Sequence, residues 1–367
     1  MTDKKYMKIA LELAVKGCGF VNPNPMVGAV IVKNNEVIGQ GYHEAYGMFH
    51  AERNAIKNCK KSLVGSTMYV TLEPCCHYGK TPPCTQLIIE SGISKVVIGT
   101  SDPNPLIGGK GVRLLRDNGI EVIEGVLKEE CDSINEVFRH YIKTKTPYVV
   151  MKYAMTMDGK IATYTGESKW ITGETSRKKV HEDRFKYSGI MVGVGTVLLD
   201  DPMLNCRLNN GKNPVRIICD TCLKTPIDSK IVNTANEIPT IIATGETDKE
   251  KQRLYIDKGC RIIVVPTEDN HINLKKLMNI LGQEKIDSIL LEGGGTLNWS
   301  ALNSKIVNKI QTYIAPKIFG GIDAKSPVLG IGVDNPQNAF HLKNTKIIRM
   351  DGDILIESDV VYQCSQG

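Results

Sequence analysis

The chain alternates strand-like and helix-like apolar patterns, and this alternation constrains its fold more than any other feature. The first 145 residues open with an amphipathic stretch that carries Met7, Ala10, Leu11 and Ala14. Strand patterns then follow at "VGAVIV", "VIGQGY", "TMYVTL", "KVVIGT" and "IEVIEG". Helical patterns separate them, from His50 and at "TQLIIESG" and "GGKGVRLLRDNG". Apolar strands interleaved with helices predict a layered α/β domain with helices on both faces of a sheet.

A second α/β alternation begins after residue 147. The segment "CDSINEVFRHYIKTKTP" predicts the last helix of the first half, and Pro147 marks a boundary. New strand patterns follow at "YVVMKYAM", "IMVGVGTVL", "PVRIICD", "PTIIAT", "RIIVVP", "SILLEGGG" and "KIQTYIAPKIF". Because 367 residues exceed one typical compact domain, we expect two domains, residues 1–146 and 147–367.

Composition excludes several classes of protein. No apolar run approaches the roughly 20 residues that cross a bilayer, and "MTDKKYMKIALELA" lacks the features of a secretory signal. We therefore expect a soluble, cytoplasmic protein that does not bind a membrane. Eleven cysteines without such a signal favour reduced thiols or a metal site over disulfides. A net charge of +6, with basic and acidic residues mixed, suits an anionic small molecule about as well as nucleic acid.

Two short segments carry the residues of a candidate zinc site. Hydrolytic zinc chemistry needs three protein ligands, a free position for water, and a carboxylate that moves protons without binding the metal. His50 and Glu52 meet this need if they open the helix "HAERNAIKNC", and Cys75 and Cys84 can supply thiolates. A helix amino terminus near Cys84 would favour a thiolate there.

The residues alone also allow other sets of zinc ligands. Cys76 and His77 adjoin Cys75 and could coordinate, although neighbours on one short loop rarely reach the same metal. A purely structural zinc would need a fourth protein ligand and would leave Glu52 without a role.

The order "HAE", then "PC", then a further cysteine resembles the cytidine deaminase superfamily, H-x-E…P-C-x-x-C. Here the second cysteine lies nine residues after the first instead of three. With "GKTPPC", "NPNPMVGAVIV" and "SDPNPLIGGKG", this resembles the deaminase domain of the bifunctional riboflavin-biosynthesis deaminase/reductases. The resemblance implies a three-layer α/β/α cytidine-deaminase-like fold and one Zn²⁺ per chain. It also implies zinc ligands at His50, Cys75 and Cys84, with Glu52 as the catalytic proton shuttle.

The same resemblance implies a set of residues that contact the deaminase substrate. They are Asn24, His43, Lys80, Asp102 and Asn104. An amide and an imidazole can read the edge of an aminopyrimidinone, and a lysine suits a phosphate. Without the family, Asn24 and Asn104 are equally explained by turn chemistry beside proline, and His43 by a surface position.

The second half contains two glycine-rich segments. "GVGTVL" begins like a Rossmann fingerprint but lacks the third glycine and the later acidic residue, so that reading is weak. "LLEGGGTLNW" places three glycines between a buried strand and a helix, where backbone amides could approach a pyrophosphate. A simple connection explains such a turn about as well.

Four segments together, "MKYAMTMDGKIA", "GESKWIT", "GVGTVLLDDPMLNCR" and "LLEGGGTLNW", resemble the reductase domain of the same bifunctional family. The resemblance implies a dihydrofolate-reductase-like α/β domain that uses NADPH. The implied cofactor-binding residues are Ala154, Trp170, Thr196, Asp200, Gly293, Gly294, Gly295 and Thr296. The implied substrate-binding residues are Lys152, Ser168, Arg184, Leu204, Arg207 and Glu292. Taken alone, Trp170 could be core, Asp200 could start a turn, and both arginines could be solvated.

The resemblance implies two consecutive steps of riboflavin biosynthesis on phosphorylated pyrimidines, a hydrolytic deamination and an NADPH-dependent reduction. We expect small-molecule substrates, no nucleic acid, and a homo-oligomer. Two alternatives differ in class: a nucleobase or tRNA deaminase with an unrelated second domain, and a non-enzymatic zinc protein that binds nucleic acid. The 6% aromatic content and mixed charge disfavour the latter. Residues 325–367 contain no usable motif.

Overall fold

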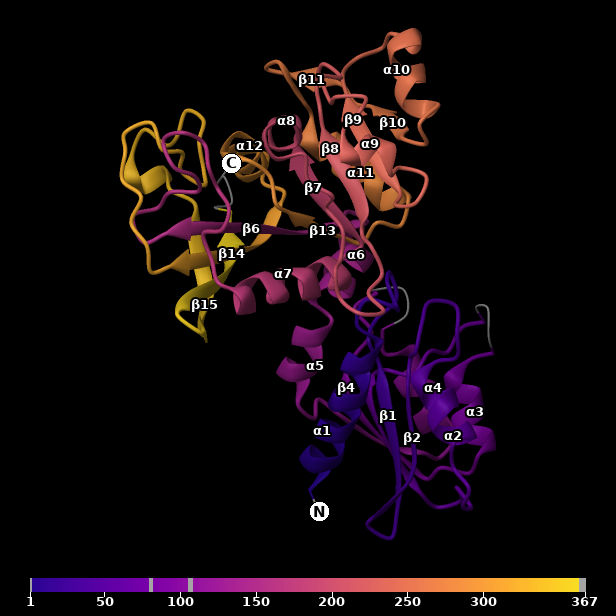
Figure 1. Ribbon diagram of the computed structural model, residues 1–367. Coiled ribbons are helices and arrows are strands. Elements are labelled where there is room, and N and C mark those ends of the chain that lie inside the picture. Colours follow the sequence, from indigo (N-terminus) through magenta and orange to yellow (C-terminus); the bar gives the residue numbers. More distant parts are fainter. Residues whose placement is uncertain (1, 79–81, 105–107, 363–367) are drawn as a thin grey trace. The chain divides into compact units, whose positions relative to one another are not determined.

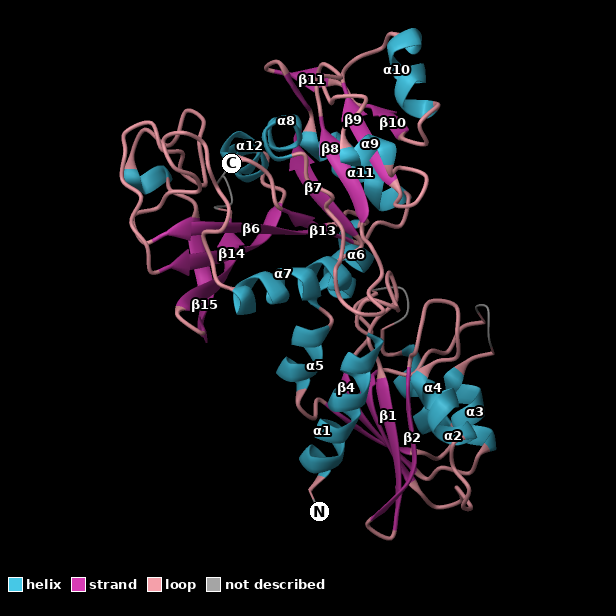
Figure 2. Cartoon of the chain, viewed as in Figure 1, coloured by secondary structure: helices cyan, strands magenta, loops and turns pink. Residues whose placement is uncertain are grey.

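The computed structural model describes residues 2–78, 82–104 and 108–362. The chain divides into two compact units, Met1–Lys145 and Thr146–Gly367 (Figure 1). Each unit contains its own sheet and helices, as the secondary-structure colouring shows (Figure 2). Within the described part of the chain, no helix combines the length and apolar character needed to cross a membrane.

The first unit is built on a five-stranded sheet with the order β2-β1-β3-β4-β5. The strands are β1 (Gly28–Lys33), β2 (Glu36–Tyr42), β3 (Thr67–Leu72), β4 (Lys95–Thr100) and β5 (Glu121–Glu124). Strand β1 pairs antiparallel with β2 and β3, whereas β3, β4 and β5 are parallel. The carboxyl ends of parallel strands meet at one edge of a sheet, which is where ligands bind in open α/β folds.

Helices cover both faces of this sheet. They are α1 (Asp3–Ala14), α2 (Ala51–Lys57), α3 (Cys84–Glu90), α4 (Lys110–Asp117), α5 (Lys128–Ile134) and α6 (Glu136–Thr144), with a short 3₁₀ turn η1 (Val15–Gly17). Side chains alternate along β1: Val30 and Val32 pack with α1, whereas Ala29 and Ile31 belong to the core that includes helix α2. The predicted three-layer α/β/α arrangement is confirmed.

The second unit is built on a nine-stranded sheet with the order β10-β9-β8-β7-β13-β6-β14-β16-β15. The strands are β6 (Tyr148–Thr156), β7 (Gly189–Gly193), β8 (Val215–Cys219), β9 (Thr240–Thr244), β10 (Arg261–Val264), β13 (Ser288–Leu291), β14 (Val307–Ala315), β15 (His341–Met350) and β16 (Asp353–Val361). A separate pair consists of β11 (Thr267–Glu268) and β12 (His271–Ile272). The strands from β10 to β14 in this order are parallel, and β16 and β15 add antiparallel pairs.

Two large cores lie against this sheet. The helices are α7 (Glu174–Lys186), α8 (Val194–Asp200), α9 (Lys230–Asn233), α10 (Lys249–Ile256), α11 (Leu274–Gln283) and α12 (Gly295–Asn303), with a 3₁₀ turn η2 (Pro336–Asn338). One core includes Leu277 of α11 and Ala301 of α12, and the other includes Ile231 of α9 and Tyr255 of α10. The apolar strand patterns of the sequence are thus buried between helices, as an α/β domain requires.

The last helix predicted for the first unit is in fact two helices. Asn135 separates α5 from α6 with a non-helical backbone (φ −111°, ψ 23°). Its side chain forms two hydrogen bonds with the main chain of Met26: the Met26 N–H donates to Asn135 Oδ1 (2.8 Å), and Asn135 Nδ2 donates to the Met26 carbonyl (2.9 Å). The single-helix prediction was wrong because asparagine competes for backbone groups, here those of a distant segment.

Candidate functional site

The zinc-ligand candidates converge in the first unit from three places along the chain. His50 is the N-cap of α2, Cys84 is the first residue of α3, and Cys75 lies in the loop after β3. The His50 Nδ1 atom lies 3.5 Å from Cys75 Sγ and 3.4 Å from Cys84 Sγ. Tetrahedral zinc with ordinary bond lengths places nitrogen and sulfur ligands about 3.6 Å apart. The three donor atoms therefore fit one zinc ion.

The two cysteine thiols are hydrogen-bonded to each other, which shifts their pKa values in opposite directions. A hydrogen bond between the thiols has the largest effect, and with the His50 ring it lowers the pKa of Cys75 to about 4 despite burial. The same bond, together with burial, raises the pKa of Cys84 well above its ordinary value. Cys75 therefore loses its proton more readily than Cys84, and zinc binding requires the thiolate form of both residues.

Glu52 lies in the first turn of α2 and has only 3% of its surface exposed. Burial raises the pKa of its carboxyl group to about 7, although the nearby His50 acts in the opposite direction. A carboxyl group with a pKa near neutrality can both accept and release a proton. Among the described residues, the metal-ligand cluster consists of His50, Cys75 and Cys84 without Glu52.

A pocket of about 340 Å³ opens at this cluster. Its lining comprises Asn24, Pro25, Val27, His43, His50, Glu52, Leu72, Glu73, Cys75, His77, Asp102, Asn104, Phe138 and Ile142. Four of the five residues predicted to contact the deaminase substrate, namely Asn24, His43, Asp102 and Asn104, are in this lining. The fifth, Lys80, lies outside the described residues. Of the alternative ligands, His77 lines the pocket, while Cys76 lies outside the metal-ligand cluster.

His43 and Asn24 form a connected pair on the pocket wall. Asn24 Nδ2 donates to His43 Nε2 (3.1 Å), so His43 carries its proton on Nδ1 and donates it to the carbonyl of Phe49 (3.0 Å). Burial lowers the pKa of His43, and its side chain is 3% exposed. His43 is therefore a neutral, oriented imidazole and not a surface histidine.

Sequence reasoning missed the far wall of the pocket. Phe138 and Ile142 come from α6, and Glu73 directly follows β3. The two apolar residues carry no chemical signature. Their helical spacing on "NEVFRHYI" was the only available signal, and it does not say what the helix covers.

The second unit holds a buried ionic cluster made of three predicted substrate residues. Arg184 of α7 meets Glu292, which follows β13, through Nε to Oε1 (2.7 Å) and Nη2 to Oε2 (3.1 Å). Lys152 of β6 lies 3.7 Å from the same carboxylate. Burial alone would raise the pKa of Glu292, but Arg184 and Lys152 hold it at about 2. Burial lowers the pKa of Lys152.

The loop after α8 joins this cluster. Arg184 Nη1 donates to the carbonyl of Asn205 (3.0 Å), which fixes the segment that contains the buried Leu204 and the exposed Arg207. The Arg207 N–H donates to His181 Nδ1 (3.3 Å), and the Cys206 thiol donates to the His181 carbonyl (3.5 Å), so α7 holds this loop at three points. Sequence reasoning did not single out His181.

The cofactor candidates lie on several elements of the second unit. Ala154 is on β6, Thr196 and Asp200 are on α8, and the loop Gly293, Gly294, Gly295 and Thr296 leads from β13 into α12. A Cβ atom on Gly294 would lie 3.6 Å from Thr196 Oγ1, so the glycine loop and the start of α8 are adjacent. The predicted strand–glycine loop–helix arrangement is confirmed.

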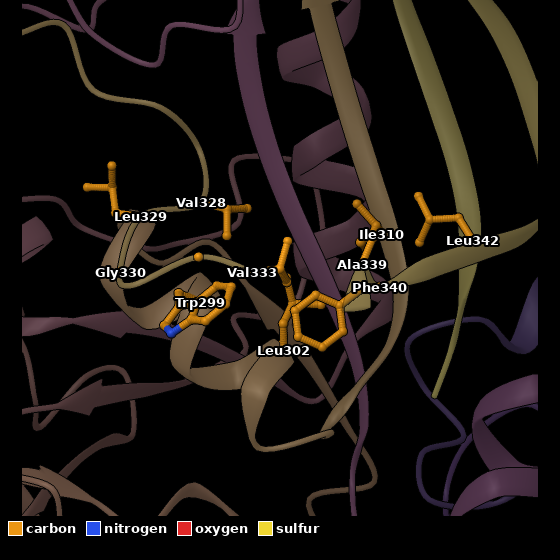
Figure 3. A pocket seen from close by; sticks show the side chains of 11 residues that line it. Trp299, Leu302, Ile310, Val328, Leu329, Gly330, Val333, Ala339, Phe340 and Leu342 are labelled. Atoms are coloured by element: carbon orange, nitrogen blue, oxygen red, sulfur yellow. The ribbon is translucent and has the colours of Figure 1, made fainter. Parts of the chain in front are cut away.

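Ser168 and Trp170 lie on the segment between β6 and α7. The Trp170 ring stacks on the Arg177 guanidinium at 4.9 Å and is 60% exposed, so it is not a core residue. A separate apolar pocket of about 470 Å³ involves Trp299 and Phe340 (Figure 3). None of the predicted reductase residues lines that pocket.

Comparison with known proteins agrees with this organisation. Residues 1–100 match the cytidine and deoxycytidylate deaminase zinc-binding region, and residues 147–356 match the RibD C-terminal domain. The riboflavin biosynthesis protein RibD of Actinobacillus pleuropneumoniae is 54% identical over 361 residues, covering 98% of this chain and 96% of that protein.

Two solved structures are similar over nearly the whole chain. Acinetobacter baumannii RibD superposes with a TM-score of 0.88 at 33% identity, covering 98% of this chain and 99% of that one. A diaminohydroxyphosphoribosylaminopyrimidine deaminase/5-amino-6-(5-phosphoribosylamino)uracil reductase from Thermotoga maritima gives 0.85 at 42% identity, with the same coverage.

Fold and site together define a zinc-dependent deaminase joined in one chain to a reductase. The chain belongs to the RibD family of bifunctional riboflavin biosynthesis proteins. Membership of this family implies zinc and NADPH as cofactors, and phosphorylated pyrimidine intermediates as substrates. The RibD C-terminal match also rules out the alternative of a deaminase with an unrelated second domain.

Proposed function

We propose that residues 1–146 deaminate 2,5-diamino-6-ribosylamino-4(3H)-pyrimidinone 5′-phosphate. Residues 147–367 then reduce the ribosyl side chain of 5-amino-6-ribosylaminouracil 5′-phosphate to a ribityl chain. The two family matches, at residues 1–100 and 147–356, support this division. The names of the two activities of the Thermotoga maritima relative support the substrates.

In the deaminase half, His50, Cys75 and Cys84 would hold the zinc ion, which would supply a Lewis acid that lowers the pKa of a water molecule. Glu52 takes a proton from the attacking water and passes protons to the ring nitrogen and to the departing ammonia. Burial suits Glu52 to both steps, since it raises the pKa of the carboxyl group to about 7.

Asn24, His43, Asp102 and Asn104 recognise the pyrimidinone, and Lys80 binds the phosphate. The neutral His43 ring, whose Nδ1 proton is held by Phe49, keeps a fixed orientation toward the pocket. A fixed hydrogen-bonding pattern along the pocket wall distinguishes the aminopyrimidinone edge from other rings.

In the reductase half, bound NADPH would be the hydride source for reduction at C1′ of the open form of the sugar. Ala154, Trp170, Thr196, Asp200 and the loop 293–296 hold the cofactor. Lys152, Ser168, Arg184, Leu204, Arg207 and Glu292 face the substrate. The Arg184–Glu292 pair fixes the position of Lys152 and of the 204–207 loop around the reacting sugar.

The observation that carries the proposal is the meeting of three metal ligands and the buried Glu52 in one pocket. To test the proposal, purified, zinc-loaded protein is incubated with the diaminopyrimidinone phosphate. Ammonia release is followed first without NADPH, and NADPH oxidation is followed after its addition. We expect ammonia in the first stage and oxidation only in the second. Absence of ammonia release would refute the deaminase assignment, and absence of oxidation would refute the reductase assignment.

We also propose that the protein is a homo-oligomer in the cytoplasm. Strand β15 lies at an edge of the nine-stranded sheet, and its Ile347 is 69% exposed. An edge strand presents unpaired main-chain N–H and C=O groups, which can pair with a strand of another chain. Light scattering of the purified protein tests the assembly, and a molar mass of one chain would contradict it.

A further inference from the structure

Glu73 directly follows β3 and is 5% exposed. Its carboxylate accepts four hydrogen bonds, all from main-chain N–H groups of one segment. Oε2 accepts from Asp102 (3.2 Å) and Gly109 (3.0 Å). Oε1 accepts from Gly111 (3.0 Å) and Val112 (3.3 Å). One side chain thus binds both described parts of this segment, residues 102–104 and 108–112.

This segment leads into α4, and Gly111 and Val112 belong to the first turn of that helix. The first N–H groups of a helix have no partner within the helix, and a carboxylate there satisfies them and opposes the helix dipole. A Cβ atom on Gly111 would lie 2.3 Å from the carbonyl oxygen of Pro74, so the helix start packs directly on the chain beside Glu73. Glu73 therefore links Asp102 and the start of α4 to the end of β3.

The same segment presents two residues to the deaminase pocket. Asp102 and Asn104 both line it, and the Asn104 N–H donates to Asp102 Oδ1 (2.8 Å). The Gly108 N–H in turn donates to the Asn104 carbonyl (2.8 Å). Because the main chain of Asp102 is bonded to Glu73, a displacement of that carboxylate moves this wall of the pocket.

We infer that Glu73 is a positioning residue for the deaminase substrate, acting through Asp102 and Asn104. This inference rests on the proposed substrate role of those two residues. It assigns Glu73 no part in binding zinc or in moving protons. The effect of losing it should therefore fall on substrate affinity, with the metal and the proton transfer intact.

Glu73→Gln is the direct test, because the amide has nearly the same shape but turns an N–H₂ group toward two main-chain donors. We expect the KM for the diaminopyrimidinone phosphate to rise about tenfold, as loss of hydrogen bonds to a buried charge implies. We expect kcat to change by less than about threefold, since only binding is affected. Zinc content should remain unchanged.

Thr71→Val is the matched control. Thr71 is buried on the same strand and accepts a hydrogen bond from the Gly28 N–H, far along the chain from the 102–112 segment. This change should destabilise the unit without raising KM. If Thr71→Val raises KM as much as Glu73→Gln does, the effect is one of general stability and the inference is refuted.

Asp102→Ala tests the substrate role of Asp102 independently of the role inferred for Glu73. If Asp102→Ala raises KM and Glu73→Gln adds little to it in the double variant, Glu73 acts through Asp102. Full additivity, or an unchanged KM in Glu73→Gln, overturns the inference while the substrate role of Asp102 stands. An unchanged KM in Asp102→Ala refutes the substrate role itself.

Gly111→Ala perturbs the contact between Glu73 and the start of α4 by a change in α4. It replaces Glu73→Gln as the test if that variant fails to fold. Its Cβ atom would press on Pro74 and on Glu73 Oε1, at 3.1 Å from the latter. We expect a higher KM with full zinc content. Loss of zinc in either variant would mean that the segment acts through the Cys75 loop, and this would overturn the inference.

Discussion

Arg184 and Glu292 form a two-point ion pair between α7 and the end of β13, with contacts of 2.7 and 3.1 Å. Both groups are nearly buried, and Lys152 shares the same carboxylate at 3.7 Å. One carboxylate therefore balances two cations inside the second unit. Losing one partner of a buried ion pair destabilises the fold, because the remaining charge is left without water or a counter-ion.

Glu292→Gln should weaken the second unit and its activity. Removing one partner of a buried ion pair costs about 3–5 kcal/mol, so the free energy of unfolding should fall by that order. Reduction should be severely impaired, whereas deamination should remain. Chemical denaturation and the two separate assays check this. Glu284→Gln, which breaks the exposed pair with Arg261, is the control and should cost less than about 1 kcal/mol. Loss of deamination in Glu292→Gln would contradict two independent sites.

The stability contribution of Glu292 should depend on pH. Its pKa is lowered from 4.5 to about 2 in the folded chain. A depressed carboxyl pKa stabilises the fold above the unfolded value, and this contribution is lost as pH falls from 4.5 toward 2. The difference in unfolding free energy between wild type and Glu292→Gln should be constant from about pH 7 to 5 and shrink below that. A difference that stays constant in acid would show that Glu292 is not the ionised partner.

Glu52→Gln should retain zinc and lose deamination. The amide fills the same space but cannot accept a proton, and general acid–base catalysis contributes about 10²- to 10⁴-fold. Ammonia release should fall by that factor, while metal analysis should show one zinc per chain. Reduction of the supplied deaminated intermediate provides the internal control. Near-normal ammonia release would refute the proton-shuttle role.

The three neighbouring cysteines should differ in their effect on zinc. Cys75→Ser and Cys84→Ser each remove a donor from the cluster, so zinc should be lost from both. Cys76→Ser is the matched control, since Cys76 adjoins Cys75 but lies outside the cluster, and it should keep one zinc per chain. Mass spectrometry of each purified variant measures the zinc content per chain. Loss of zinc from Cys76→Ser would show that the loop uses a different set of zinc ligands.

The fold was largely predictable because apolar periodicity is a local signal. The strands followed the apolar runs, and Cys84 opens a helix as expected. The break at Asn135 was not predictable, since its cause is a pair of bonds to Met26, far away in the sequence. The final β-hairpin, β15 and β16, lies where the sequence contains no motif.

Residues of the candidate site were predictable only where they belong to short sequence motifs. The spacing of His50 and Glu52 on one helix start indicated a ligand and a proton carrier. The roles given to Lys152, Arg184 and Glu292 came from family resemblance, because three distant segments build that ionic cluster. Glu73 directly precedes the "PC" of the deaminase pattern, and nothing local to it reveals which main-chain groups it binds.

The far wall of the deaminase pocket defines how much of the chain that activity needs. The zinc-binding region matched by the family ends at residue 100, yet Phe138 and Ile142 of α6 line the pocket. Asn135 anchors the start of α6 to Met26. A fragment cut at residue 100 would keep every zinc donor but leave one side of the pocket open to solvent. An isolated deaminase should therefore be cut no earlier than residue 145, the end of the first compact unit.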